Sequence, residues 1–284
     1  MTYQTILVHC DDGRPAVART ELAAALAERH QAHLIGLHVR PPFRPPFQPP
    51  VYDNGSFAMG MMFKDHEDAL VKSEIASSKI FAAAVKGKAI TSEWRSADGY
   101  ADDLLTEHAR YADLAVVGQN DPETATRLPM PSDLPESVAL ATGRAVLVVP
   151  FVGASAAIGR NVLLCWNASR ESARAATEAL PLLQAAASVT VLVVGAKTSE
   201  SGHGAEPGAD AAIWLGRHGV KVSVQRDAAP DADVGSLILS RAMDHGCDLI
   251  VMGIYGHSRL RELVLGGASR TVLASMTVPV LMAH

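Results

Sequence analysis

DLIVMGIYGHSRLRELVLGGAS, residues 248–269, is the stretch that most clearly predicts how this chain folds. It opens with an apolar run at 249–252, which is typical of a buried parallel strand and ends at Gly253. A helical pattern resumes at Ala268. The glycines that lie between are Gly256, Gly266 and Gly267. Glycine lets a ligand approach the backbone closely, and the N–H groups that open a helix attract anions, so the spacing predicts a phosphate site above the carboxyl end of a sheet.

The same order of elements occurs twice along the chain. Residues 5–39 read as strand, turn, Ala-rich helix and strand, and residues 161–194 repeat this order at an offset of 156 residues. We expect the two helices at 16–29 and 172–186. The other matching pairs are 112–118 with 247–253 and 140–148 with 273–281. Such a repeat indicates one domain present twice.

Each copy alternates strands with helices, which predicts a parallel sheet covered by helices on both faces. The strands of the first copy are expected at 4–9, 33–39, 89–95, 113–117 and 145–149. Those of the second copy are expected at 161–166, 188–194, 220–226, 248–252 and 278–283. The fold class is therefore α/β, with two tandem open five-stranded parallel sheets. The domains are expected at residues 1–150 and 161–284, with a linker at 151–160.

A strand followed by Gly-x2-Gly-x9-Gly, from Gly253 to Gly266, resembles the nucleotide-binding motif of the universal stress protein family. In that family the pattern ends in glycine followed by Ser or Thr, whereas here Gly267 follows and the hydroxyl comes at Ser269. The resemblance covers both copies and implies strand order 3-2-1-4-5 in each, an adenine nucleotide alpha hydrolase-like, Rossmann-like sheet. Such a sheet has a crevice at the carboxyl ends of its first and fourth strands.

The resemblance implies that the second copy binds an adenine nucleotide, ATP or AMP, with or without Mg²⁺. Asn167 stands where the family has an aspartate on the ribose and adenine side, and it can still hydrogen-bond a hydroxyl. Arg259 and Arg270 either pair with phosphate oxygens or lie on a solvated helix face. The expected nucleotide-binding residues are Asn167, Ala168, Val194, Gly253, Gly256, His257, Ser258, Arg259, Gly266, Gly267, Ala268, Ser269 and Arg270.

The first copy lacks the glycine pattern after its fourth strand. Prolines in the segment 122–135 lack the backbone N–H, and nearby acids would repel phosphate. These acids are Asp121, Glu123, Asp133 and Glu136. We therefore expect no nucleoside triphosphate there. The degenerate site would comprise Asp11, Asp12, Val39 and Gly118.

Composition and charge argue against several classes of partner. A net charge of −5 and 5% aromatic residues offer neither a basic surface nor a stacking platform for nucleic acid. No apolar run reaches the length of a membrane span, and residues 1–10 lack the basic flank of a signal peptide. Cys10, Cys165 and Cys247 form no CxxC pair, so we expect reduced thiols and a cytoplasmic protein.

No spacing typical of metal ligands and no nucleophile elbow is evident, so we expect neither a metal site nor catalytic residues. Three interpretations stay open: a nucleotide-binding stress protein, a family member that acts by protein contact without nucleotide, and a nucleotide-dependent enzyme such as a weak hydrolase. The edge strands near Val146 and Val280 are free to pair with another copy. We expect the two copies to form an intramolecular pseudo-dimer, which can dimerise again. The proline-rich segment 41–50 favours an extended flap, or alternatively a ligand for a proline-reading domain.

Overall fold

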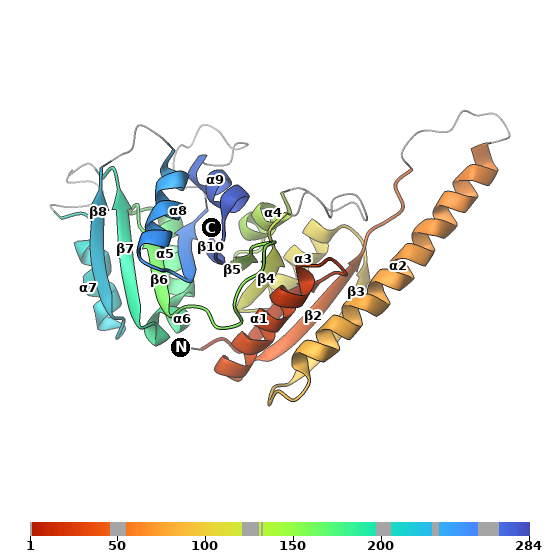
Figure 1. Cartoon of the computed structure of the whole chain (residues 1–284), viewed down its shortest axis with the longest axis horizontal. Helices are drawn as coiled ribbons and strands as arrows, with labels where there is room; N and C mark the ends of the chain where they lie inside the picture. Colours follow the sequence, from red (N-terminus) through yellow and green to blue (C-terminus); the bar gives the residue numbers. More distant parts are fainter. Residues whose placement is uncertain are drawn as a thin grey trace.

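The chain folds around one continuous sheet of ten strands with helices on both faces (Figure 1). The computed structural model describes residues 2–45, 55–120, 131, 133–196, 206–228, 233–254 and 267–284. Among them, no helix combines the length and the apolar character needed to cross a bilayer.

The apolar runs of the sequence form all ten of the expected strands. The largest shift is at β3, which was expected from residue 89 and begins at Ser92. In the N-terminal half the strands are β1 (Thr5–Cys10), β2 (His33–Arg40), β3 (Ser92–Asp98), β4 (Leu114–Gly118) and β5 (Ala145–Val149). In the C-terminal half they are β6 (Asn161–Cys165), β7 (Ser188–Val194), β8 (Val222–Asp227), β9 (Leu249–Gly253) and β10 (Val280–Ala283).

The strand order is β3-β2-β1-β4-β5-β10-β9-β6-β7-β8, so each half has the expected order 3-2-1-4-5. The expectation of two separate sheets is corrected, because β5 and β10 pair antiparallel, with Leu147 opposite Leu281. Both strands are fully buried and apolar, and an unpaired edge would leave their N–H and C=O groups without partners. Because this junction is antiparallel, the carboxyl ends of the strands in the two halves point in opposite directions.

Two layers of helices cover the sheet. One face packs against α1, α2, α5, α6 and α7, and the other against α3, α4, α8 and α9. The helices of the N-terminal half are α1 (Ala16–His30), α2 (Gly55–Val85), α3 (Ala101–Ala109) and α4 (Leu134–Ala141). Those of the C-terminal half are α5 (Arg170–Glu178), α6 (Leu180–Ala185), α7 (Ala209–Arg217), α8 (Val234–Asp244) and α9 (Gly267–Ser275).

Two further expectations need correction. The single helix expected at 172–186 is broken into α5 and α6, because Pro181 lacks the N–H that would continue the first helix. The offset between the copies is not constant. It is 156 where β6 matches β1 (161 − 5) and 155 where β7 matches β2 (188 − 33), so the C-terminal half has one residue fewer between the starts of its first two strands.

The proline-rich segment lies only partly within the described residues, and residues 46–50 lie outside them. Its described part packs on its own half. The Phe43 ring lies 5.7 Å from the Phe63 ring on α2, and the Arg44 guanidinium lies 4.6 Å from the centre of the Tyr100 ring before α3. The Met-rich residues that follow it form the first turns of α2.

Side chains also bridge the two halves, which form the expected intramolecular pair. Tyr3 donates its hydroxyl hydrogen to the Glu178 carbonyl at 2.9 Å, and Arg174 donates to the Gly143 carbonyl at 2.8 Å. The buried amide of Gln119, directly after β4, donates to the carbonyls of Leu273 at 2.8 Å and Ala274 at 3.3 Å in α9. These bonds tie the last turn of α9 to the N-terminal half.

We predict that Gln119→Leu lowers the free energy of unfolding by about 2 kcal/mol, because two carbonyls and the Phe151 N–H lose a buried partner. Chemical denaturation monitored by circular dichroism measures the change. Gln184→Leu is the control, because the exposed Gln184 amide makes one bond, to the His218 carbonyl at 2.9 Å. Equal losses for the two variants would contradict a bridging role for Gln119.

Candidate functional site

In the N-terminal half, the side chain of Arg19 fills the crevice between the carboxyl ends of β1 and β4. Arg19 is only 4% exposed. Its Nε donates to the His9 carbonyl at 2.9 Å, and its Nη2 donates to Asp11 Oδ2 at 2.6 Å. A Cβ on Gly118 would collide with Nη1 of Arg19. Gly118 is thus the residue that makes room for the guanidinium.

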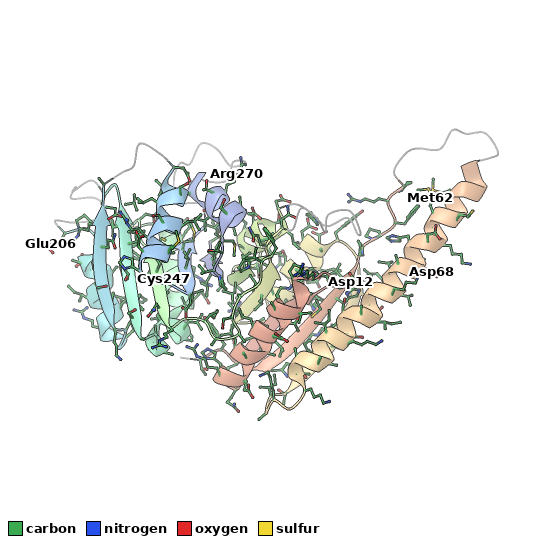
Figure 2. All side chains as sticks on the ribbon, in the orientation of Figure 1. Asp12, Met62, Asp68, Glu206, Cys247 and Arg270 are labelled. Atoms are coloured by element: carbon green, nitrogen blue, oxygen red, sulfur yellow. The ribbon has the colours of Figure 1, made fainter. Side chains whose placement is uncertain are left out.

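Asp11 is engaged within the protein on both of its oxygens. Oδ2 pairs with Arg19, and Oδ1 accepts the Gly13 N–H at 2.8 Å in a turn that leads to α1. Burial acts to raise the pKa of the Asp11 carboxyl, but Arg19, His9 and the Gly13 N–H stabilise its charged form and lower the pKa to about 2. The neighbouring Asp12 is exposed (Figure 2), and Val39 is buried in the core.

His9 lies beside this ion pair and is itself buried. Its Nδ1 is 3.8 Å from Asp11 Oδ2. Burial lowers the pKa of His9 to about 4; Asp11 opposes this shift, while Arg19 and His38 add to it. The imidazole is therefore neutral at neutral pH, and the charge at this crevice is confined to the Asp11–Arg19 pair.

The C-terminal half has the same turn but lacks the arginine. Asn167 Oδ1 accepts the Ser169 N–H at 3.2 Å, as Asp11 accepts that of Gly13. Ala175 stands at the position of Arg19 and is fully buried. Ala168 has φ +57°, a left-handed conformation that costs a non-glycine residue about 1 kcal/mol. Asn167 and Ala168 are both exposed at the end of β6.

Gly253, at the end of β9, makes room for the first turn of α5. A Cβ at this position would lie 2.6 Å from the Glu171 carbonyl carbon and 2.7 Å from the Ser172 nitrogen. The glycine thus has a packing role here. Glu171 is a buried acid at this edge, paired with Arg170. Burial acts to raise the pKa of Glu171, but the bond from Arg170 outweighs it and the pKa is lowered.

Helix α9 begins at Gly267, which is exposed, and has no acid in its first turn. Asp233 caps α8 by accepting the Ser236 N–H at 3.0 Å, and its other oxygen lies 3.7 Å from the position of a Cβ on Gly267. Further along α9, Ala268 is half-buried, Ser269 is buried and Arg270 is exposed (Figure 2). Burial raises the pKa of Glu136 in α4, and Arg270 partly offsets this across the junction between the halves.

The structure brings four of the expected residues to one edge of the C-terminal half. Asn167, Ala168, Val194 and Gly253 lie at the carboxyl ends of β6, β7 and β9, which are neighbours in the sheet. Five others fall within 255–266, outside the described residues. These are Gly256, His257, Ser258, Arg259 and Gly266.

Comparison with known families identifies the fold. The universal stress protein family model matches residues 2–150 and again 159–284. The chain belongs to the universal stress protein family. A search of curated proteins finds no match.

Solved structures share the tandem architecture of this universal stress protein. A universal stress protein from Archaeoglobus fulgidus DSM 4304 covers 98% of this chain and 95% of its own, at 16% identity and a TM-score of 0.69. A functionally unknown protein from Pseudomonas aeruginosa PAO1 covers 99% and 92%, at 16% identity and a TM-score of 0.55. A putative universal stress protein from Pseudomonas aeruginosa UCBPP-PA14 covers 99% and 93%, with the same identity and score. At these identities the likeness is one of fold.

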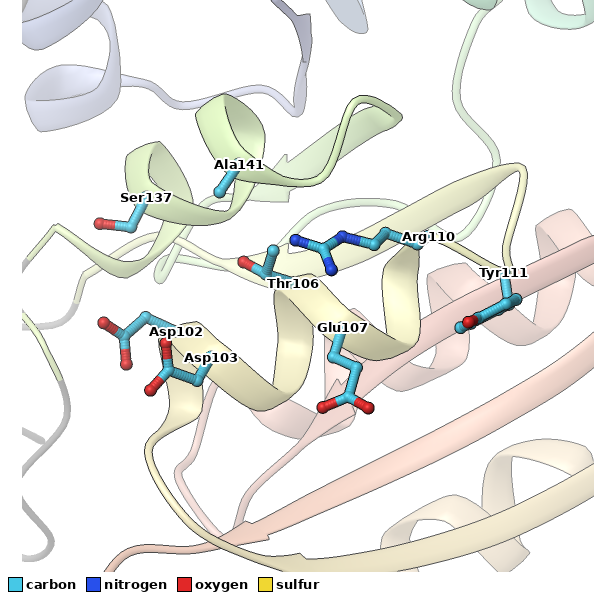
Figure 3. Close-up of a pocket in the computed structure, with 8 residues that line it drawn as sticks. All are labelled: Asp102, Asp103, Thr106, Glu107, Arg110, Tyr111, Ser137 and Ala141. Carbon is cyan, nitrogen blue, oxygen red and sulfur yellow. The ribbon is translucent and has the colours of Figure 1, made fainter.

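Two surface hollows of this universal stress protein have linings that include none of the residues described for the two crevices. One, of about 470 Å³, lies between α3 and α4, where Asp102, Asp103 and Glu107 line α3 beside Arg110 (Figure 3). The other, of about 370 Å³, lies between Pro41 and the start of α3. Their acidic linings are unsuited to phosphate.

Sequence reasoning missed three charged residues at the two edges, Arg19, Glu171 and Asp233. The sequence contained a signal for the burial of Arg19, because this residue falls on the Ala-rich face of its helix with Ala16, Thr20 and Ala23. There was a signal for Asp233 too, as an acid that precedes an apolar helix. Among the residues that the structure describes, no group of three His, Cys, Asp or Glu side chains is placed to hold a metal ion.

We predict that this universal stress protein loses about 2 kcal/mol of stability between pH 7 and pH 5 through His9 alone. The pKa of His9 is about 4 when folded against 6.5 in the unfolded chain, so the unfolded state binds the proton first. Stability is therefore full above pH 6.5 and falls as the pH drops towards 4. Denaturation curves at both pH values measure the loss.

His9→Cys, which copies the Cys165 found at the same position of the other half, should remove this part of the pH dependence. A smaller dependence should persist from His30, whose pKa burial also lowers to about 4. If His9→Cys keeps the full loss between pH 7 and pH 5, His9 is not buried in its neutral form.

Proposed function

We propose that this universal stress protein binds an adenine nucleotide, ATP or AMP, at the carboxyl edge of its C-terminal half, as a binding module rather than an enzyme. One observation carries the proposal: the contrast between α9 and its counterpart α4. Helix α9 begins at the exposed Gly267 with no acid in its first turn, whereas α4 has Pro135 and Glu136 there. N–H groups that open a helix have no partner within it and attract phosphate, while proline and acid remove that attraction.

The crevice beside α9 supports the same proposal. In the N-terminal half, Arg19 and Asp11 satisfy each other where a ligand would enter. In the C-terminal half Ala175 replaces the arginine. Only the Oδ1 of Asn167 is used in the turn, where it accepts the Ser169 N–H. Its amide hydrogens therefore stand as donors for a ribose hydroxyl. The pattern Gly253-x2-Gly256-x9-Gly266 occurs in this half alone.

Mg²⁺ fits the proposed site through Asp233. One oxygen of this carboxylate lies 3.7 Å from the position of a Cβ on Gly267, where it would repel an unscreened triphosphate. Mg²⁺ is usually held by one or two carboxylates together with phosphate oxygens and water. We propose that ATP binds with Mg²⁺, whereas AMP, with less charge, needs it less.

A second candidate function is action by protein contact without nucleotide. The carboxylates of Asp233 and Glu171 at this edge favour it, because both act against a bound anion. For either function we propose a cytoplasmic location, in keeping with three cysteines that form no disulfide.

Isothermal titration of the full chain with ATP·Mg²⁺ and with AMP tests the proposal. We predict measurable binding of at least one nucleotide, and a rise in Kd of about tenfold or more for Gly267→Asp, which sets a carboxylate at the start of α9. An acid at a helix N-terminus favours the helix itself, so lost affinity would not reflect lost folding.

Ser137→Asp is the matched control, because it adds the same charge to the counterpart helix α4. It should leave the Kd unchanged. The proposal fails if the wild-type chain binds no adenine nucleotide, or if Gly267→Asp binds as tightly as wild type. Absence of binding would favour action by protein contact.

A further inference from the structure

Helix α2 is far longer than its place in the fold requires. It has 31 residues, whereas α7, which connects the corresponding strands of the C-terminal half, has 9. A helix of that length spans roughly 46 Å, while the seven residues of the neighbouring β3 span roughly 23 Å. Figure 1 shows α2 along the outside of the sheet at one end of the molecule, with its N-terminal turns projecting beyond the sheet.

The two sides of α2 differ in what they contact. The inner side packs on the sheet through Leu70, Phe81 and Ala84, which are buried. The outer side carries large apolar side chains in solvent: Met61 is 55% exposed, Val71 49% and Ile75 50%. With the exposed Ala82, these residues follow one side of the helix at helical spacing. We call Met61, Val71, Ile75 and Ala82 the outer stripe.

The charges beside the outer stripe are unevenly distributed along the helix. The acids Asp65 and Asp68 lie towards its N-terminal end together with Lys64, and only lysines, Lys72, Lys79 and Lys86, lie towards its C-terminal end. All six are exposed, and within the described part of the chain none of them has an ion-pair partner within 4.0 Å. The acids on the inner side differ, because Glu67 and Glu74 both pair with Arg40.

We propose that the outer stripe is the surface through which two copies of this chain pair, with α2 antiparallel to α2 of the partner subunit. A two-fold axis close to the level of Leu70 would set Asp68 of each copy opposite Lys72 of the partner subunit. The apolar residues Val71 and Ile75 would pack beside these two ion pairs. Parallel pairing would set like charges against like, so the charge order selects the antiparallel arrangement.

The size of the surface sets the strength of the dimer. The outer stripe runs over residues 61–82, roughly 33 Å of helix. One pair of helices of this length would bury roughly 1,000 Å² in total, which is at the lower end of the size range of specific interfaces. The dimer therefore depends on concentration, unlike the pairing of the two halves through β5 and β10.

Sedimentation velocity of the full chain over a range of concentrations tests the proposal. We predict a monomer–dimer equilibrium whose Kd rises roughly 100-fold or more in Ile75→Glu, because the symmetry places two charges among the apolar residues of the interface. Ile213→Glu on α7 is the matched control, since Ile213 is 52% exposed on the counterpart helix. It should leave the Kd unchanged, and both variants should melt like wild type because neither side chain is in the core.

Charge reversal tests the antiparallel orientation. Asp68→Lys and Lys72→Asp should each raise the Kd roughly tenfold, and the double variant should restore the wild-type value. The proposal is overturned if the chain is monomeric at all concentrations, or if Ile75→Glu and Ile213→Glu act alike. Failure of the double variant to restore pairing overturns the antiparallel geometry.

Discussion

The antiparallel pairing of β5 with β10 is the interaction on which the rest of the structure depends. Each strand is the apolar fifth strand of its half, and the pairing satisfies edge groups that would otherwise be left without partners. It also sets the edge of the sheet at which each crevice opens. Since the two halves run in opposite directions, their crevices open at opposite edges of the sheet, and α9 reaches back to Gln119 in the N-terminal half.

The two crevices share the same turn after their first strand but differ in the side chains that fill them. In the N-terminal half, Arg19 lies over Gly118 and pairs with Asp11, so the crevice is filled by the protein itself. In the C-terminal half, small Ala175 replaces the arginine, and Gly253 lets α5 approach β9. One substitution on the first helix thus decides whether the end of the first strand meets a guanidinium or stays exposed.

The sequence predicted the strands well, because buried parallel strands leave long apolar runs and the repeat checks each run against its counterpart. Their order was implied by the resemblance to the universal stress protein family and is confirmed in both halves. The sequence did not predict the single sheet, because the apolar pattern of an edge strand does not specify which strand pairs with it. The role of Gly253 was missed in part, because periodicity does not say whether a glycine makes room for a ligand or for a neighbouring helix. Arg19 was overlooked as one charge in an Ala-rich helix, although its place on the buried face was a signal.

The central claim is that the two halves differ in function, with nucleotide bound by the C-terminal half alone. Photolabelling of the full chain with an azido-adenine nucleotide, followed by mass spectrometry of its peptides, tests this most directly. The account predicts that every label competed by unmodified ATP or AMP falls within residues 161–284. Competed label on peptides of the N-terminal half, near Asp11 or Gly118, would contradict it.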